Sequence, residues 1–217
     1  MANDAIRAVL WDFGGVLTDS PFDAFREYER ARGLPEDLIR SLNARNPDTN
    51  AWARFERSEI DLDAFDSAFA AEARAVGHAV SGREVVKLLY GRIRPEMVEA
   101  LKRCGRVYRN ACLTNNVNAG SGHGLPTSDE RAAEVAEVLR LFEVVIESRK
   151  IGVRKPDAQF YRIALETLGI EARQAVYLDD LGVNLKPARA LGMHTIKVGA
   201  AEPALRNLEE ILQMPLR

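Results

Sequence analysis

The sequence has few of the residues that build disulfide scaffolds or thiolate metal sites. Only two of its 217 residues are cysteine, Cys104 and Cys112, and their spacing fits neither a zinc site nor a disulfide framework. Its three histidines, His78, His123 and His194, also lack metal-ligand spacing. We therefore expect both cysteines to be structural thiols, and we interpret His78 and His194 as structural.

The chain also lacks an excess of one charge and any long apolar run. Its 30 Lys and Arg residues nearly balance 32 Asp and Glu residues, so no basic face for nucleic acid is expected. No segment approaches the roughly 18 consecutive apolar residues of a membrane helix, and the first residues lack a signal-peptide pattern. The composition predicts a soluble, cytoplasmic protein that acts on a small molecule, and it carries no signal for an oligomeric state.

Short apolar runs alternate with helix-like segments along the chain. With 47% hydrophobic residues, the chain is long enough for one compact core plus an insertion. Strands separated by helices favour an α/β fold with a parallel sheet flanked by helices. The expected strands are Ala8–Trp11, Ala111–Leu113, Val144–Ile146, Ala175–Leu178 and Thr195–Val198.

The stretch between the first two expected strands is far longer than one crossover connection needs. From about Thr18 to Arg92, aromatic and aliphatic residues recur at helical spacing, which predicts a helical insertion over 18–92 and a core formed by 1–17 and 93–217. Within it, the spacing of Ser81 and Glu84 predicts a capping box. Beyond it, helices are expected over Glu96–Cys104 and Pro203–Gln213.

Polar side chains follow four of the expected strands at the point where each strand ends. In an open parallel sheet, ligands bind beyond the carboxyl ends of the strands, so these residues are the candidates for chemistry. Each alone has an ordinary structural explanation, as a turn acid, a helix cap or a solvated loop cation. Their order is what indicates a common site: Asp12, then Thr114–Asn116, then Lys155, then Asp179 and Asp180.

This set of groups suits attack on a phosphate ester. A phosphate dianion repels a carboxylate nucleophile, and a magnesium ion held by hard oxygen ligands such as Asp12 and Asp180 would offset that repulsion. Lys155 and the Thr114 hydroxyl could stabilise the phosphoryl oxygens. Asp12 would then form a covalent aspartyl-phosphate that water hydrolyses.

The four motifs together resemble the haloacid dehalogenase-like (HAD) superfamily. Asp12–Thr18 is similar to its nucleophile motif, Leu113–Asn116 to the second motif, Lys155–Pro156 to the third and Leu178–Asp180 to the fourth. The longer run Tyr177–Arg189 resembles the N-terminal phosphatase domain of soluble epoxide hydrolases and related bacterial HAD phosphatases.

The resemblance implies a Rossmann-like core in which the insertion over 18–92 is an α-helical cap that closes over the active site. It implies a magnesium ion held by the Asp12 carboxylate, the Gly14 backbone carbonyl and Asp180, with Asp179 beside or within the coordination shell. The expected function is a magnesium-dependent phosphatase for a small phosphorylated metabolite. Its expected catalytic residues are Asp12, Thr114 and Lys155, and its expected substrate-binding residues are Thr114, Asn115 and Lys155.

Gly14 departs from the usual phosphatase pattern, in which a second aspartate two residues after the nucleophile donates a proton to the leaving group. Two alternatives therefore stay open: a haloacid dehalogenase, which needs no such acid, and a weakly catalytic phosphate-binding module. The acidic pair Asp179 and Asp180 disfavours the dehalogenase, because that reaction needs no metal. His123 follows the second motif in a glycine-rich loop, so we interpret it first as a solvated loop histidine and, as the alternative, as a candidate for the missing acid.

Overall fold

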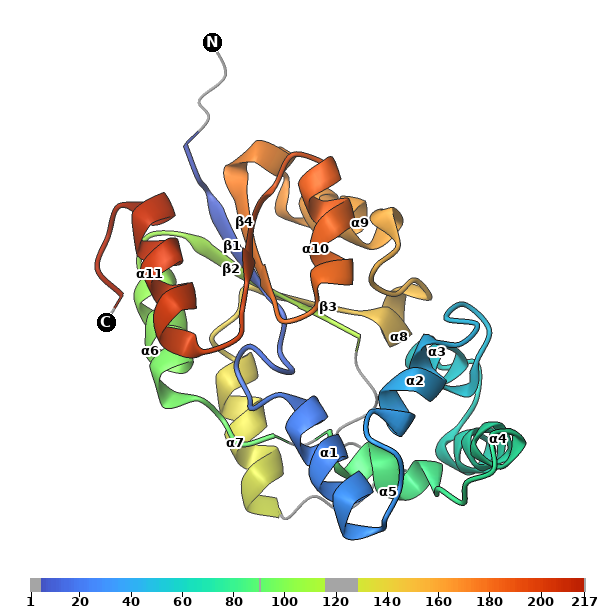
Figure 1. Ribbon diagram of the computed structural model, residues 1–217. Helices are drawn as coiled ribbons and strands as arrows, with labels where there is room; N and C mark the ends of the chain where they lie inside the picture. Colours follow the sequence, from blue (N-terminus) through green and yellow to red (C-terminus); the bar gives the residue numbers. More distant parts are fainter. Residues whose placement is uncertain (1–4, 90, 116–128, 217) are drawn as a thin grey trace.

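The core of the protein is a five-stranded parallel sheet. The computed structural model describes residues 5–89, 91–115 and 129–216. The strand order is β3-β2-β1-β4-β5, so the first strand of the chain lies at the centre of the sheet (Figure 1). All four strand pairings are parallel, which confirms the predicted sheet. The strands are β1 Ala8–Trp11, β2 Arg109–Thr114, β3 Val144–Glu147, β4 Ala175–Asp179 and β5 His194–Lys197.

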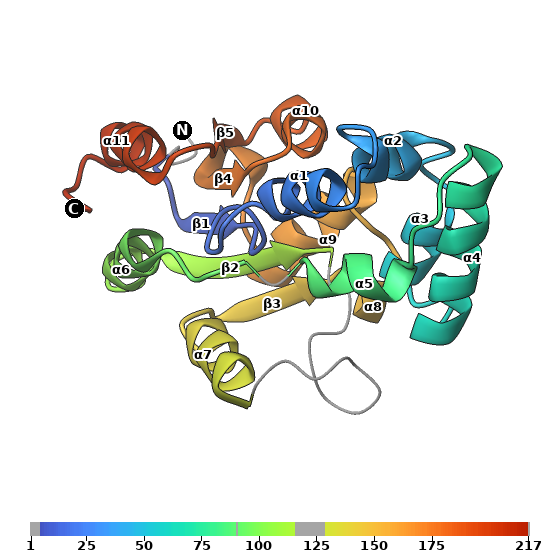
Figure 2. The ribbon, with the colours of Figure 1, turned by 60° about the horizontal axis from the view of Figure 1, so that its bottom comes forward.

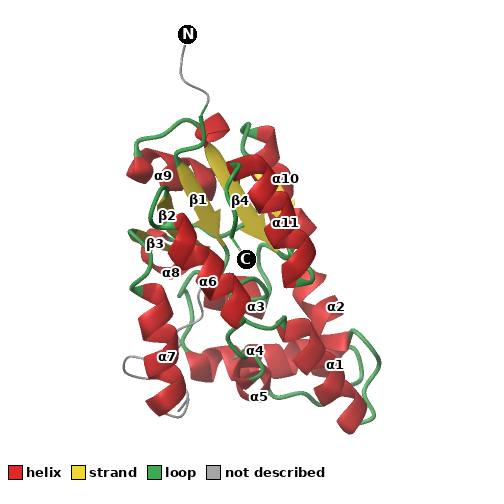
Figure 3. Cartoon of the chain, turned by 90° about the vertical axis from the view of Figure 1, so that its left-hand side faces the viewer, coloured by secondary structure: helices red, strands yellow, loops and turns green. Residues whose placement is uncertain are grey.

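Helices cover both faces of this sheet (Figure 3). Alternating strand residues point to opposite faces, so Val9 and Trp11 pack with one hydrophobic cluster while Ala8 and Leu10 pack with the other. The first cluster includes side chains of α6 (Pro95–Cys104), α7 (Asp129–Leu139) and α11 (Ala201–Leu212). The second includes side chains of α9 (Ala158–Leu168) and α10 (Gly182–Ala190). Because β1 is buried on both faces, its four residues form a continuous apolar run.

Five helices lie between β1 and α6, and they gather at one end of the sheet (Figure 2). This helical insertion has a hydrophobic cluster of its own, centred on Phe65 and Phe69. Several of its aromatic rings meet edge to face; for example, the ring centroids of Trp52 and Phe65 lie 5.7 Å apart. The helices are α1 Pro21–Ala31, α2 Leu38–Ala44, α3 Ala51–Glu56, α4 Leu62–Ala75 and α5 Gly82–Lys87.

The chain enters and leaves the insertion along two adjacent segments. Thr18 forms an antiparallel bridge with Ile93. The amide of Asp19 donates to the Arg92 carbonyl at 2.8 Å, and the amide of Arg94 donates to the Leu17 carbonyl at 2.8 Å. The two connections are therefore joined to each other where they leave the core.

Several local predictions differ from the structure in detail. The Ser81 hydroxyl accepts from the Glu84 amide at 3.4 Å, which confirms the helix start. The Glu84 carboxylate, however, accepts from Tyr28 of α1 and from Arg32 at its C-terminal end. β2 begins two residues before the expected Ala111. The last helix begins two residues before the expected Pro203.

Two candidates, Asn116 and His123, lie outside the described residues. Within the part of the chain that the structure describes, every helix is too short or too polar to cross a membrane.

Candidate active site

The polar residues after the strands meet at one edge of the sheet. Asp12 directly follows β1, Thr114 ends β2 and Asp179 ends β4, so parallel pairing of these strands brings their carboxyl ends together. Lys155 reaches the same place from the loop that follows α8 (Ser148–Ile151). Its ammonium lies 2.9 Å from a carboxylate oxygen of Asp12.

Lys155 is the centre of a buried hydrogen-bond network. Only 1% of its surface is exposed, and its ammonium also donates to Asp179 at 2.9 Å and to the Tyr177 hydroxyl at 3.1 Å. Burial alone would lower the Lys155 pKa, but the carboxylates of Asp12 and Asp179 raise it above its usual value. The side chain is therefore a fixed positive charge beside Asp12.

The two acids at the end of β4 have different surroundings. Asp179 is fully buried, and its carboxylate accepts hydrogen bonds from Lys155, Tyr177, the Leu181 amide and the Asn184 side chain. Asp180 is partly exposed and lines a large cavity that lies between the sheet edge and the helical insertion. The geometry makes Asp180 the more available of the two for a ligand.

Asp12, Asp179 and Asp180 form an acidic cluster. Each offers one carboxylate oxygen, and these oxygens lie within 4.8 Å of one another. Burial raises the pKa of Asp180 to about 6, and the neighbouring Asp179 acts in the same direction. Burial likewise raises the pKa of Asp12, an effect that Lys155 only partly offsets. Hard oxygen donors crowded in this way suit a divalent cation such as magnesium, which would relieve their repulsion.

The two glycines after Asp12 have separate reasons to be glycine. Gly15 has φ of 72°, and a Cβ there would overlap the carboxylate of Asp180. Gly14 lines the cavity, and a Cβ there would meet no described atom within 4 Å. Space therefore requires glycine at position 15 but does not require it at position 14.

The second motif supports the lysine loop. The Asn115 side chain accepts from the Lys155 amide at 2.8 Å and donates to the Lys155 carbonyl at 3.0 Å. Both polar atoms of this amide therefore hold the Lys155 backbone, and Asn115 and Thr114 also line the cavity.

The acidic cluster opens into a cavity of about 1050 Å³ between the sheet edge and the helical insertion. The insertion contributes aromatic side chains to its wall, including Phe22, Phe25 and Trp52. Sequence reasoning did not single out Tyr177 as a site residue, because it lies inside an apolar strand. Its position two residues before Asp179 puts both side chains on one face of β4, and that spacing was the available signal.

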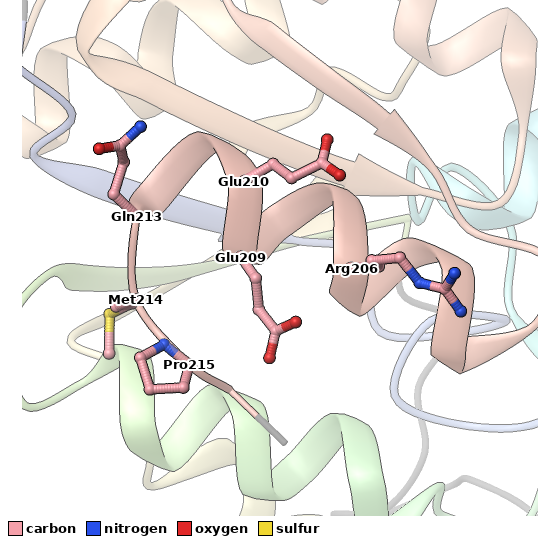
Figure 4. Close-up of a pocket in the computed structure, with 6 residues that line it drawn as sticks. All are labelled: Arg206, Glu209, Glu210, Gln213, Met214 and Pro215. Carbon is pink, nitrogen blue, oxygen red and sulfur yellow. The ribbon is translucent and has the colours of Figure 1, made fainter.

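A second, smaller hollow of about 420 Å³ lies near the C-terminus. Figure 4 shows its lining side chains, which extend from the middle of α11 to the segment that follows the helix. None of the three acidic-cluster residues lines this hollow, so the larger cavity is the candidate active site.

Comparisons with known proteins agree with the motifs. A family model for haloacid dehalogenase-like hydrolases matches residues 6–192. Acyl-CoA dehydrogenase family member 10 of Mus musculus is 32% identical over 97% of this chain and 19% of its own length. Bifunctional epoxide hydrolase 2 of Mus musculus is 28% identical over 95% of this chain and 39% of its own length. The chain thus spans about a fifth to two fifths of the length of these relatives.

A relative of similar size is phosphatase MT3486 of Mycobacterium tuberculosis. It is 30% identical over 89% of this chain and 88% of its own length. With the epoxide hydrolase match, this relative confirms the resemblance predicted from the motifs.

Solved structures share the fold. A predicted HAD-like family hydrolase from Porphyromonas gingivalis aligns with a TM-score of 0.65 at 21% identity, covering 97% of this chain and 99% of its own. A HAD family enzyme from Bacteroides thetaiotaomicron in complex with magnesium and inorganic phosphate aligns with a TM-score of 0.60 at 20% identity. The alignment covers 91% of this chain and 96% of that one. L-2-haloacid dehalogenase from Xanthobacter autotrophicus aligns with a TM-score of 0.59 at 19% identity. The alignment covers 98% of this chain and 84% of that one. The fold alone therefore does not select the reaction.

Proposed function

The chain belongs to the haloacid dehalogenase-like hydrolase family, and within that family we propose that it is a magnesium-dependent phosphatase. Its substrate is a small phosphorylated metabolite, and its nucleophile is Asp12. The observation that carries the proposal is the buried contact of Asp12 with Lys155 next to the Asp180 carboxylate, in the wall of one large cavity. The phosphatase relative from Mycobacterium tuberculosis supports the same reaction.

The acidic cluster would hold the magnesium ion. We assign the Asp12 carboxylate, the Gly14 backbone carbonyl and Asp180 as ligands, with Asp179 beside them, because Asp179 already accepts several protein hydrogen bonds. When bound, the ion neutralises charge on the phosphate and on the carboxylates. The Bacteroides thetaiotaomicron enzyme with magnesium and phosphate supports this assignment.

The chain's own residues carry out the chemistry. An Asp12 oxygen forms a bond to phosphorus while the ester oxygen leaves with the bonding electrons, and water then cleaves the aspartyl-phosphate to release phosphate. Lys155 orients Asp12 and stabilises the phosphoryl oxygens with its fixed charge, and the Thr114 hydroxyl donates to the same oxygens. Asn115 contributes by holding the Lys155 backbone.

Gly14 has no proton to give to the leaving group. The enzyme should therefore favour substrates whose leaving group departs without protonation, such as aryl or acyl phosphates. The same residue favours the alternative of a weakly catalytic phosphate-binding module. The dehalogenase alternative is disfavoured because a cluster of three acids would repel a carboxylate substrate unless a cation were bound.

We also propose that the protein acts in the cytoplasm. The helical insertion is the cap of the proposed enzyme. Side chains of α1, α2 and α3 line the cavity opposite Asp12, so movement of the insertion would open and close the site. The joined connections at Thr18 and Ile93 are the place for such a hinge.

The test is hydrolysis of an aryl phosphate with magnesium, after chelation and in the variant Asp12→Asn. We expect turnover only with magnesium, and a loss of more than about a thousandfold in the variant, because an amide cannot form the aspartyl-phosphate. Circular dichroism of the variant controls for folding. Undiminished turnover after chelation would contradict the metal assignment, and a loss in the variant below about tenfold would move the nucleophile elsewhere.

A further inference from the structure

The cavity is much larger than a phosphoryl group needs. Its core end holds Asp12 and Lys155, while the insertion forms a continuous aromatic wall on the other side. In that wall, Phe22 and Phe25 meet edge to face with ring centroids 6.0 Å apart, and Phe25 meets Trp52 at 6.5 Å. An apolar or aromatic part of the substrate would bury itself against these rings.

The positive charges that line the cavity fall into two groups. Most of them are already paired with a carboxylate, so they offer little free charge to a ligand. These paired cations are Arg57 with Glu59, Arg149 with Glu147, Arg154 with Glu56, and Lys155 with Asp12 and Asp179. Arg40 of α2 also lines the cavity, and it forms no ion pair with any carboxylate in the described parts of the chain.

Arg40 is held in place without being neutralised. Its guanidinium carbon lies 5.2 Å from the centroid of the Phe22 ring, which is a cation–π contact. Stacking of this kind restricts the side chain and leaves its N–H groups free for a planar anion such as a carboxylate. The contact also joins Arg40 to the aromatic wall.

We propose that Arg40 is a specificity residue that binds a second anionic group of the substrate. The substrate class is then a phosphate monoester whose leaving group has an aromatic or apolar segment and, beyond it, a carboxylate. The phosphoryl end lies at Asp12, the apolar segment lies against Phe22, and the carboxylate reaches Arg40. This assignment rests on the proposed phosphatase function and adds the identity of the leaving group.

The experiment compares three aryl phosphates in the wild type and in Arg40→Met. The substrates are para-carboxyphenyl phosphate, its neutral analogue para-carbamoylphenyl phosphate, and phenyl phosphate. We expect Arg40→Met to lower kcat/KM for the carboxylated substrate about fivefold, mainly through KM, because the lost contact is an exposed ion pair. The two neutral substrates should change by less than about twofold, and salt should reduce the difference. Differences in leaving-group pKa cancel because each substrate is compared between two enzymes.

Arg45→Met is the matched control. Arg45 follows α2, is exposed and does not line the cavity, so its loss removes the same charge from the same part of the insertion. Equal changes for all three substrates in Arg40→Met, no change for the carboxylated one, or the same change in Arg45→Met would each overturn the proposal.

A binding measurement separates this proposal from the phosphatase function. Calorimetry with para-(phosphonomethyl)benzoate, which cannot be hydrolysed, should show affinity about fivefold weaker in Arg40→Met than in the wild type. If the wild type hydrolyses none of the aryl phosphates, the phosphatase function fails. The role of Arg40 in anion binding is then decided by calorimetry alone, where equal affinities would overturn it.

Discussion

At the scale of single residues, the proposed phosphatase function makes Gly14 the position that decides which leaving groups the site handles well. The space around it predicts that Gly14→Asp folds, because a Cβ there meets no described atom within 4 Å and φ is not positive. The new carboxyl would face the cavity and could protonate the departing oxygen. General acid catalysis contributes about 10²–10⁴-fold, so alkyl phosphates should gain by about a hundredfold and good leaving groups should gain little.

The measurement is log(kcat/KM) against leaving-group pKa, which should be steep in the wild type and flatter in Gly14→Asp. Gly199→Asp is a control that adds the same charge at a glycine outside the cavity and equally free of close contacts. A flat wild-type plot would mean that another residue already donates the proton.

Individual site residues were predictable where chemistry follows a strand end. Asp12 and Asp180 could be singled out because apolar runs locate their strands, and parallel strands share one functional edge. Lys155 lies beyond both β3 and α8, and its place in the order of the four motifs was the signal for it. For Tyr177 the only signal was its spacing from Asp179, two residues along the same strand. Arg40 could not be singled out, because its position at the cavity depends on how α2 packs against α1.

At the scale of elements, one ion pair joins α3 of the insertion to the lysine loop of the core. Arg154 lies 2.7 Å from a Glu56 carboxylate oxygen and also donates to the Pro47 carbonyl at 2.7 Å. Neither the Arg154 Nε nor that Glu56 oxygen has a hydrogen-bond partner within the described residues, so this contact is an ion pair without a well-directed hydrogen bond. The Ser148 hydroxyl donates to the Glu56 carbonyl at 2.7 Å beside it.

We expect a double-mutant cycle of Glu56→Gln and Arg154→Met to give a coupling free energy of about 1–2 kcal/mol in urea unfolding, because the pair is largely buried. The exposed pair of Glu202 and Arg206 on α11 is the matched control, with an expected coupling of about 0.3 kcal/mol. The kcat/KM should also fall in Glu56→Gln and in Arg154→Met, because Arg154 directly precedes Lys155 and loss of the ion pair would loosen the lysine loop. Equal coupling free energies in the two cycles would show that the ion pair of Glu56 and Arg154 does not hold α3 against the lysine loop.

The elements differ in how far the sequence specifies them. The buried strands and the amphipathic helices α6 and α11 were predicted to within about two residues, a normal error for helix and strand ends. The insertion was predicted to be helical as a whole, but its division into separate helices was not predicted. Helices as short as α3 and α5 depend on packing against neighbours more than on their own periodicity.

At the scale of the whole molecule, the acidic cluster links stability to pH and, through the proposed metal site, to magnesium. The pKa of Asp180 is raised to about 6 in the folded chain from an ordinary value near 3.8, so the proton binds the folded state more tightly than the unfolded state. The stability from this group is present at low pH and is lost as pH rises through about 6. Magnesium bound by the folded chain would restore it.

We therefore expect saturating magnesium to raise Tm by about 5–10 °C at pH 7.5 and by much less at pH 5, measured by calorimetry at constant ionic strength. Asp180→Asn should remove most of the difference between the two pH values. An equal shift at both pH values would contradict the linkage.

The class of the fold was predictable because alternating strands and helices favour a parallel sheet. The strand order was not, because β1 pairs with β2 and β4, both far away in sequence. Nothing local to Ala8–Trp11 identifies these partners.

The bridge between Thr18 and Ile93 has a consequence for how the chain folds. Pairing of Ala8 with Arg109 closes a loop of about a hundred residues, and closure entropy rises with the logarithm of loop length. Once the insertion has collapsed on its own cluster and the bridge has formed, the free chain between these strands is about a quarter as long. Each halving of a loop saves about 0.6 kcal/mol, so the insertion lowers the entropic barrier to joining β1 and β2 by about 1.2 kcal/mol. We therefore expect the insertion, whose side chains line the cavity, also to speed the pairing of strands at the centre of the sheet.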